Sequence, residues 1–287
     1  MTNMRRTLTT LVVAAFVSAL VEALTSDGIH HSETLSRHAF FKKVATTAAI
    51  VTSGSLSLGP NIAVATAGEE EDIAVYFGCG CFWHVQHELV EAEKTILGRS
   101  DNELTARAGY AGGTKGAKDG KVCYHNAAQI ADYGKLGHAE VVRVNIPPSA
   151  FPLFAAEYCK LFSKEGYRAD QWGDRGSEYR NLVGIPGGLN SVYAKQLVET
   201  SIKEGDKLDF AKGKGDDPDA RALSFIMDTR DFPFFTAEQY HQFHDGFAAG
   251  ENYPNSYNAL ASKYAKEGNL GNSDCPNGLL GIGALGL

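Results

Sequence analysis

The segment from Ile73 to Leu97 constrains the fold of this chain more than any other. Residues 73–77 (Ile-Ala-Val-Tyr-Phe) form a short apolar run that ends at glycine, as a buried strand does. Between Trp83 and Leu97 apolar residues recur every three or four positions, which predicts an amphipathic helix. The turn between them, Gly78-Cys-Gly-Cys81, places Cys81 where the strand becomes a helix. The apolar face of this helix carries Val85, Leu89, Ala92 and Ile96, and the opposite face His84, His87, Glu88 and Glu91.

Strand and helix patterns continue to alternate along the rest of the chain, without an internal repeat or a long linker. This indicates one mixed α/β or α+β domain of about 220 residues. The C-terminal segment 278–287 is rich in glycine and is expected to be coil. Further strands are expected at 104–110, 139–146, 182–185 and 223–227, and helices at 149–164 with Ser149 as N-cap, at 191–204, and from the capping-box pattern Thr236-x-x-Gln239.

Composition excludes several classes of protein. The chain has 44% hydrophobic residues and a net charge of -7, which is typical of a soluble globular protein. Residues 68–287 contain 22 basic and 31 acidic side chains, so no nucleic-acid partner is expected. The cysteine count is five, which is odd, so a disulfide framework is not expected and reactive thiols are.

The N-terminal region resembles two targeting signals in series. Residues 1–23 combine Arg5-Arg6, an apolar run and the small-residue pattern Val21-Glu-Ala23, as a secretory signal peptide does. Residues 24–67 repeat this arrangement, with basic residues followed by a charge-free stretch that ends in Ala65-Thr-Ala67. That stretch is too polar for a comfortable membrane span. We expect delivery through the secretory route to a plastid or the thylakoid lumen, or alternatively secretion, with a mature domain at 68–287 that has no stable membrane insertion.

Two residues carry the chemistry that the pattern predicts. A cysteine at the start of a helix faces free N–H groups and the positive end of the helix dipole, which favour the nucleophilic thiolate at Cys81. Strand alternation places Glu140 on the same face as Val142, Val144 and Ile146. A carboxyl group in apolar surroundings has a raised pKa and can carry a proton near neutral pH. The alternatives are a buried, inert cysteine and a glutamate that leans into solvent.

Five sequence motifs occur in order along the chain. They are Gly80-Cys81-Phe82-Trp83, Gly109-Tyr110-Ala-Gly112-Gly113, Gly137-His138-Ala-Glu140-Val-Val, Asp174-x-Gly176-x-x-Tyr179-Arg180 and Tyr240-His-Gln242. These motifs resemble those of the A-type peptide methionine sulfoxide reductases. The resemblance covers roughly residues 73–287 and implies the fold of that family, an α+β two-layer sandwich with a ferredoxin-like core. It also implies an oxidoreductase for methionine S-sulfoxide, free or in proteins, that acts in oxidative stress and protein repair.

The resemblance also implies a role for each matched residue. Cys81 attacks the sulfoxide sulfur and becomes a sulfenic acid, while Glu140 delivers a proton to the sulfoxide oxygen. Cys275 is the second thiol, which converts the sulfenic acid to a disulfide, and Cys79 is the alternative. No cofactor or metal is required, the reductant is a thioredoxin-like dithiol, and the protein is expected to be a monomer. Tyr110 and Tyr179 hydrogen-bond the oxygen, Phe82 and Trp83 receive the S-methyl group, and Asp174 orders the polar side of the site.

The chain departs from the family pattern in several places. Two insertions, at 114–136 and 246–274, lengthen loops, and Glu178 stands where the family prefers Gln. A C-x-C-x2-H-x2-H pattern begins at Cys79, but one residue between two thiolates is cramped for tetrahedral zinc. The competing hypotheses are a thiol peroxidase and a non-catalytic protein that binds methionine sulfoxide or zinc.

Overall fold

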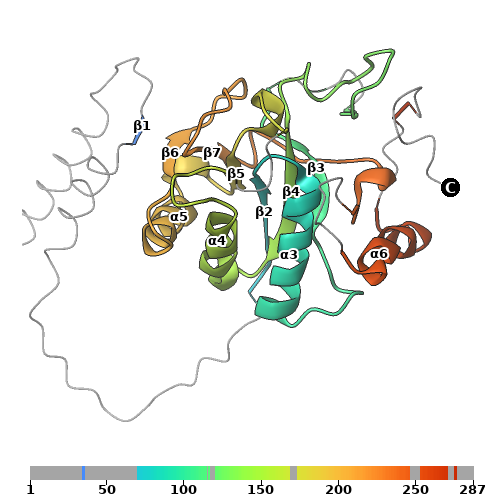
Figure 1. Ribbon diagram of the computed structural model, residues 1–287, viewed down its shortest axis with the longest axis horizontal. Coiled ribbons are helices and arrows are strands. Elements are labelled where there is room, and N and C mark those ends of the chain that lie inside the picture. The colour runs from blue at the N-terminus through green and yellow to red at the C-terminus, as the bar shows by residue number, and fades with distance from the viewer. Residues whose placement is uncertain are drawn as a thin grey trace, which may run out of the picture. The chain divides into compact units, whose positions relative to one another are not determined.

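The structure is a computed structural model, which describes residues 34–35, 70–114, 116, 120–168, 173–245, 253–270 and 275–276 (Figure 1). The strands are β1 (Thr34–Leu35), β2 (Ile73–Gly78), β3 (Arg107–Ala111), β4 (Ala139–Ile146), β5 (Leu182–Ile185), β6 (Asp209–Lys212), β7 (Leu223–Asp228) and β8 (Phe235–Thr236). The α-helices are α3 (Phe82–Leu97), α4 (Phe151–Lys160), α5 (Val192–Lys203) and α6 (Asn255–Lys266). Four 3-10 helices are η1 (Pro148–Ala150), η2 (Ser177–Tyr179), η3 (Gly188–Asn190) and η4 (Gln239–His241).

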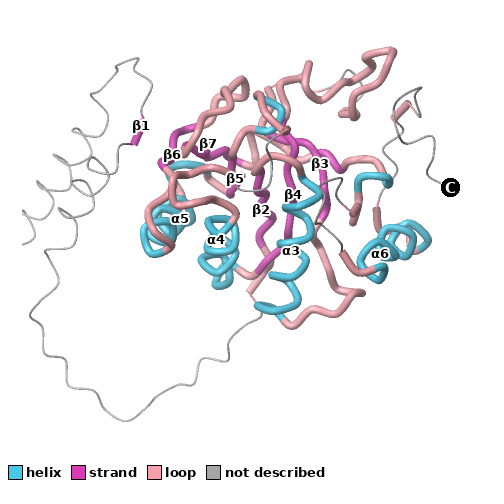
Figure 2. The backbone as a smooth tube through the Cα atoms, in the orientation of Figure 1, coloured by secondary structure: helices cyan, strands magenta, loops and turns pink. Residues whose placement is uncertain are grey.

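The described strands form one mixed sheet in the order β1-β6-β7-β5-β2-β4-β3-β8 (Figure 2). Pairing is antiparallel from β5 through β2, β4 and β3 to β8, whereas β7 is parallel to both β5 and β6. The fold is therefore α+β, as the sequence predicted. Strands β2 and β4 lie next to each other at the centre, which brings the end of β2, and with it Cys81, close to Glu140 on β4.

Helices α3, α4 and α5 lie on one face of the sheet (Figure 1). The main core lies between them and the sheet, where Val142 and Val144 of β4 are buried with Val85 and Leu89 of α3. This confirms the predicted apolar faces of both elements. The other sheet face buries a smaller cluster, in which Phe232 and Phe234 pack against Tyr76, Val141, Leu182 and Met227.

Three predicted elements differ from the structure. The helix expected from Ser149 begins at Phe151, after the 3-10 turn η1, because Pro148 fixes the backbone there and Ser149 caps nothing. The helix expected at Thr236 is absent: Thr236 ends strand β8, which pairs with β3, and only the short turn η4 follows. The strand expected at 104–110 lies at Arg107–Ala111. By contrast, Ser191 accepts a hydrogen bond from the Ala194 N–H and caps α5 as expected.

Several sequence predictions concern residues that the structure does not describe. Apart from Thr34–Leu35, these include the targeting segments 1–23 and 24–67, much of the glycine-rich tail, and parts of both insertions. None of the helices in the described ranges has the length and apolar character needed to cross a bilayer.

Candidate active site

Cys81 lies at the N-terminus of α3, as predicted. It is the N-cap residue, with extended backbone (φ -64°, ψ 128°), so its side chain stands beside the first helical turn. Gly80 makes the turn from β2 in the left-handed region (φ 70°), and its N–H donates to the Tyr179 carbonyl at 3.1 Å. Cys81 is partly exposed, whereas Cys79 and Cys159 are buried, and burial raises the pKa of Cys159 to about 11. Of these three thiols, Cys81 is the one placed to react.

Glu140 lies on the helix-facing side of β4 and is buried. Its Oε2 accepts a hydrogen bond from the Phe82 N–H at 3.0 Å, and its Oε1 accepts one from the Tyr133 hydroxyl at 3.3 Å. Burial raises the pKa of Glu140 to about 8, and the negative charges of Asp174 and Glu178 also raise it. Glu140 is thus a protonated acid at neutral pH, held at the first residue of the helix that Cys81 caps.

The tyrosine hydroxyls divide into two groups. The Tyr133 and Tyr179 hydroxyls are hydrogen-bonded to each other, and Tyr133 also contacts Glu140. Tyr110 pairs with Glu140 in the β3–β4 register and its ring stacks on Tyr133, but its hydroxyl donates to Glu238 Oε2 at 2.8 Å. Burial raises the pKa of all three tyrosines, so each hydroxyl remains a donor at neutral pH.

Tyr133 is a site residue that the sequence motifs do not identify. It belongs to the inserted loop, where Cys123 N–H donates to the Ala131 carbonyl and Tyr133 N–H donates to the Cys123 carbonyl, both at 2.8 Å. This pairing folds the loop back and directs Tyr133 toward Glu140. The loop has no strand or helix periodicity, so its sequence contains no signal that would have identified the residue.

An aromatic wall lies next to Cys81. The ring centroid of Phe82 lies 5.2 Å from that of His241, and Trp83 lies 5.9 Å from His241 and 4.0 Å from His244. Burial lowers the pKa of His241 to about 3, so this ring is neutral and packs as an aromatic group. The histidine of the motif Tyr240-His-Gln242 therefore packs against both Phe82 and Trp83.

Gln242 anchors that motif to the rest of the domain. Its side chain is buried, with Oε1 accepting from Ala108 N–H and from Gln86 Nε2, while Nε2 donates to the Ala108 and Ala237 carbonyls. Gln86 on α3 also accepts from the Phe243 N–H. The hydrogen bonds of these two glutamines therefore join η4 to α3 and to β3. Each buried polar atom of the two side chains has a partner, as burial of polar groups requires.

Two arginines join the remaining motifs. The Arg180 Nη2 donates to the carbonyls of Gly112 and Gly137 at 2.9 and 3.0 Å, which holds three of the sequence motifs together. Arg168 pairs with Asp219 and donates to the Asp174 and Tyr179 carbonyls. Asp174 itself is partly buried, and burial raises the pKa of its carboxyl group.

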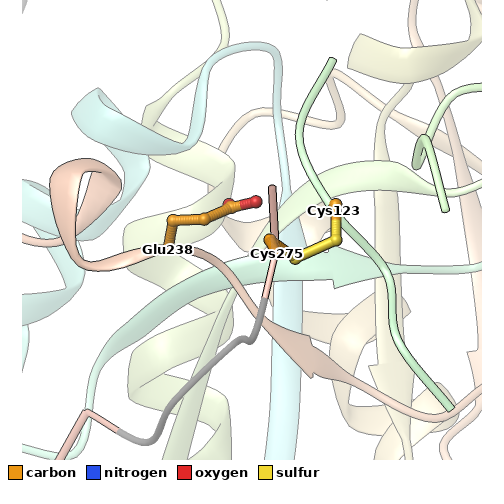
Figure 3. A group of neighbouring side chains, drawn as sticks. All are labelled: Cys123, Glu238 and Cys275. Carbon is orange, nitrogen blue, oxygen red and sulfur yellow. A yellow bond between two sulfur atoms is a disulfide. The ribbon is translucent and has the colours of Figure 1, made fainter. Parts of the chain in front are cut away.

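Cys275 is bonded to Cys123 in a disulfide with a Cα–Cα distance of 5.6 Å (Figure 3). The sequence predicts that Cys275 serves Cys81, and it does not point to Cys123 as a partner. The disulfide lies beside Glu238, whose Oε1 also accepts the Tyr124 N–H at 2.9 Å. The donor atoms of Cys123, Glu238 and Cys275 lie within 4.8 Å of one another, but the two sulfur atoms are bonded to each other in this state.

Comparisons with known proteins agree with the motifs. No protein-family model matches the sequence. Curated peptide methionine sulfoxide reductases MsrA from three strains of Vibrio cholerae serotype O1 are each 29% identical over 131 residues, which is 44% of this chain and 51% of theirs. The chain thus spans about half the length of the curated relatives it matches.

Two solved structures are similar to this one. Methionine sulfoxide reductase A of Corynebacterium diphtheriae has a TM-score of 0.40 at 18% identity, covering 65% of this chain and 85% of that one. Mxr1 from Saccharomyces cerevisiae in its reduced form has a TM-score of 0.37 at 21% identity, covering 64% and 92%. The five motifs and the curated relatives together support an MsrA-type family for this chain.

Proposed function

We propose that the protein reduces methionine S-sulfoxide, free or in proteins, to methionine. The observation that carries this proposal is the hydrogen bond between the Phe82 N–H and the protonated carboxyl group of Glu140. It holds an acid next to a cysteine at a helix N-terminus, which are the two groups that sulfoxide reduction needs. Preference for the S-epimer comes from the family resemblance.

The chemical step uses the groups around Glu140. The Cys81 thiolate attacks the sulfoxide sulfur while Glu140 gives its proton to the oxygen, and the Tyr133 and Tyr179 hydroxyls stabilise the charge that develops there. The oxygen is then transferred to the Cys81 sulfur as its bond to the methionine sulfur and the bond between the two sulfur atoms break, which leaves a sulfenic acid on Cys81 and releases methionine as the thioether. Phe82 and Trp83 receive the S-methyl group, and Asp174 holds the polar side of the substrate.

Regeneration ends, in our proposal, at the disulfide that the structure contains. The Cys275 thiol condenses with the Cys81 sulfenic acid, releasing water and forming a Cys81–Cys275 disulfide. The Cys123 thiolate then attacks Cys275, which frees Cys81 and forms the Cys123–Cys275 disulfide. A thioredoxin-like dithiol reduces that bond.

This order of steps predicts different trapped species in two variants. One turnover of Cys123→Ser without reductant should accumulate the Cys81–Cys275 disulfide, because no thiol remains to resolve it. Cys275→Ser should accumulate the sulfenic acid on Cys81. Peptide mapping by mass spectrometry checks both. A Cys81–Cys123 disulfide in Cys275→Ser would show that Cys123 attacks the sulfenic acid first. A Cys79–Cys81 disulfide would show that neither Cys123 nor Cys275 resolves the sulfenic acid.

One assay decides between this function and its alternatives. The purified full chain is incubated with the separate S and R epimers of dabsylated methionine sulfoxide and dithiothreitol, and in parallel with hydrogen peroxide. We expect turnover of the S epimer. Peroxide consumption alone would identify a thiol peroxidase, and binding of the sulfoxide without turnover would identify a binding protein.

We also infer that β2, α3, β3, β4, α4 and β5 form a ferredoxin-like core. The strand order β5-β2-β4-β3, antiparallel throughout, supports this inference. The two halves of the unit are β2-α3-β3 and β4-α4-β5, and they interleave: β4 lies between β2 and β3, and β2 lies between β4 and β5.

The proposed route through two targeting signals predicts where the mature chain begins. Cleavage after Ala65-Thr-Ala67 should give a native protein that starts at or near Gly68, in a plastid, the thylakoid lumen or the secreted fraction. N-terminal sequencing of the native protein checks this. Native protein that retains residues 30–60 would contradict import in two steps.

A further inference from the structure

His125 lies between two carboxylates from separate parts of the chain. Its Nδ1 is 2.9 Å from Asp132 Oδ2 and its Nε2 is 3.1 Å from Glu178 Oε2. Through these two contacts His125 links the inserted loop to η2.

His125 lies beside the segments that carry Tyr133, which contacts Glu140, and Tyr179, which is hydrogen-bonded to Tyr133. Asp132 precedes Tyr133 and Glu178 precedes Tyr179 in the sequence, so the two carboxylates are neighbours of the two hydroxyl-bearing residues. The His125 ring also packs on the Tyr133 ring, with centroids 4.7 Å apart. His125 thus joins the backbone segments that present Tyr133 and Tyr179 to each other.

The local backbone leaves room for this contact. A Cβ atom at Gly134 would collide with the Glu178 carboxylate, so a glycine there lets that side chain reach His125. Both features are departures from the family pattern: His125 belongs to the insertion at 114–136, and Glu178 replaces the usual Gln. In the structure, His125 and Glu178 are in direct contact.

The charged and titratable groups that face the His125 ring come from both segments. They are Asp132 and Glu178, together with Tyr124 at 5.2 Å and Tyr133 at 4.7 Å between ring centroids. The His125 ring also lies against Glu178, whose charge acts on Glu140.

We propose that His125 is a positioning residue that holds Tyr133 and Tyr179 together at Glu140, so that the inserted loop completes the site. The proposal rests on the proposed function. His125 itself does not touch the reacting atoms and acts through the two tyrosines.

The kinetic test compares two replacements of His125. His125→Gln should lower kcat about tenfold with little change in KM, because the tyrosines stabilise the transition state rather than bind the substrate. His125→Arg has several N–H donors that can reach both carboxylates and should restore most of kcat. His87→Gln is the matched control, because His87 also contacts a glutamate, Glu88, but lies on α3 outside this cluster. Equal kcat values in wild type and His125→Gln, or no rescue by Arg, would overturn the proposal.

A second measurement does not depend on activity. In the Glu140→Gln background, where Glu140 cannot ionise, the ring signals of Tyr133 and Tyr179 are followed by NMR on ¹³C-tyrosine-labelled protein. In this background, added His125→Gln should move these signals from their positions, and His125→Arg should leave them close to those positions. Ring signals that do not respond to substitution of His125 would refute the positioning role, whether or not the protein reduces methionine sulfoxide. If the signals respond but the wild type reduces no sulfoxide, the proposed function fails and the link through His125 stands.

Discussion

Replacement of Cys81 by serine should abolish reduction of methionine sulfoxide. Cys81 is the partly exposed thiol at the N-terminus of α3, beside the proton on Glu140, and a serine hydroxyl at that position is far too weak a nucleophile to replace a thiolate. Single-turnover measurement of methionine formation, with enzyme in excess over substrate, isolates this step from regeneration.

Two further variants serve as controls for Cys81→Ser. Cys159→Ser removes a buried thiol whose pKa is raised, and Cys123→Ser removes one half of the disulfide, so both should retain nearly wild-type single-turnover rates. Multiple turnover with a thioredoxin-like reductant should fail in Cys123→Ser and continue in Cys159→Ser. Wild-type single-turnover rates in Cys81→Ser would remove Cys81 from the mechanism.

Replacement of Glu140 by glutamine should lower the rate by a factor of about 10²–10⁴, the usual contribution of a general acid. The glutamine carbonyl oxygen can still accept the hydrogen bond from the Phe82 N–H, and its NH2 group can donate to the Tyr133 oxygen, so the fold should remain intact. Glu103→Gln, at an exposed carboxylate bonded to Ser100, is a control that should leave the rate unchanged.

The pH profile distinguishes loss of the acid from structural damage. The pKa of Glu140 is raised to about 8, so the proton is present below that pH and is lost above it. Wild-type single-turnover rates should therefore fall above about pH 8, and this alkaline limb should be missing from the residual activity of Glu140→Gln. An unchanged rate and profile in the variant would exclude Glu140 as the proton donor.

The same raised pKa predicts that Glu140→Gln, although less active than the wild type, is more stable than the wild type at alkaline pH. The folded chain keeps a proton on Glu140 up to about pH 8, whereas in the unfolded chain this carboxyl group loses its proton near its ordinary pKa of 4.5. The contribution of this group to wild-type stability therefore falls as the pH rises through that range. Glutamine removes this dependence. Thermal unfolding should show Glu140→Gln to be more stable than the wild type above pH 8, although it is far less active.

Most of the central elements could be predicted from the sequence because their periodicity reflects burial. The alternation along β4 placed Glu140, Val142 and Val144 on one face, and the structure buries all three on the side of the sheet that faces the helices. Elements with weaker local signals were missed or misassigned. The pattern Thr236-x-x-Gln239 looks like a helix start, but pairing with β3 draws Thr236 into the sheet.

By itself, the sequence determined the strand–turn–helix unit that carries Cys81, the face on which Glu140 lies, and the motifs that indicate the family. These features depend on neighbours within one turn or one strand, so local periodicity records them. Only the tertiary structure decided that Tyr133 contacts Glu140, that Tyr110 donates to Glu238 and that Cys123 pairs with Cys275. Each of these contacts involves the inserted loop or a segment more than a hundred residues away, and such contacts depend on how loops fold back over the sheet, which no local pattern of apolar and polar residues specifies.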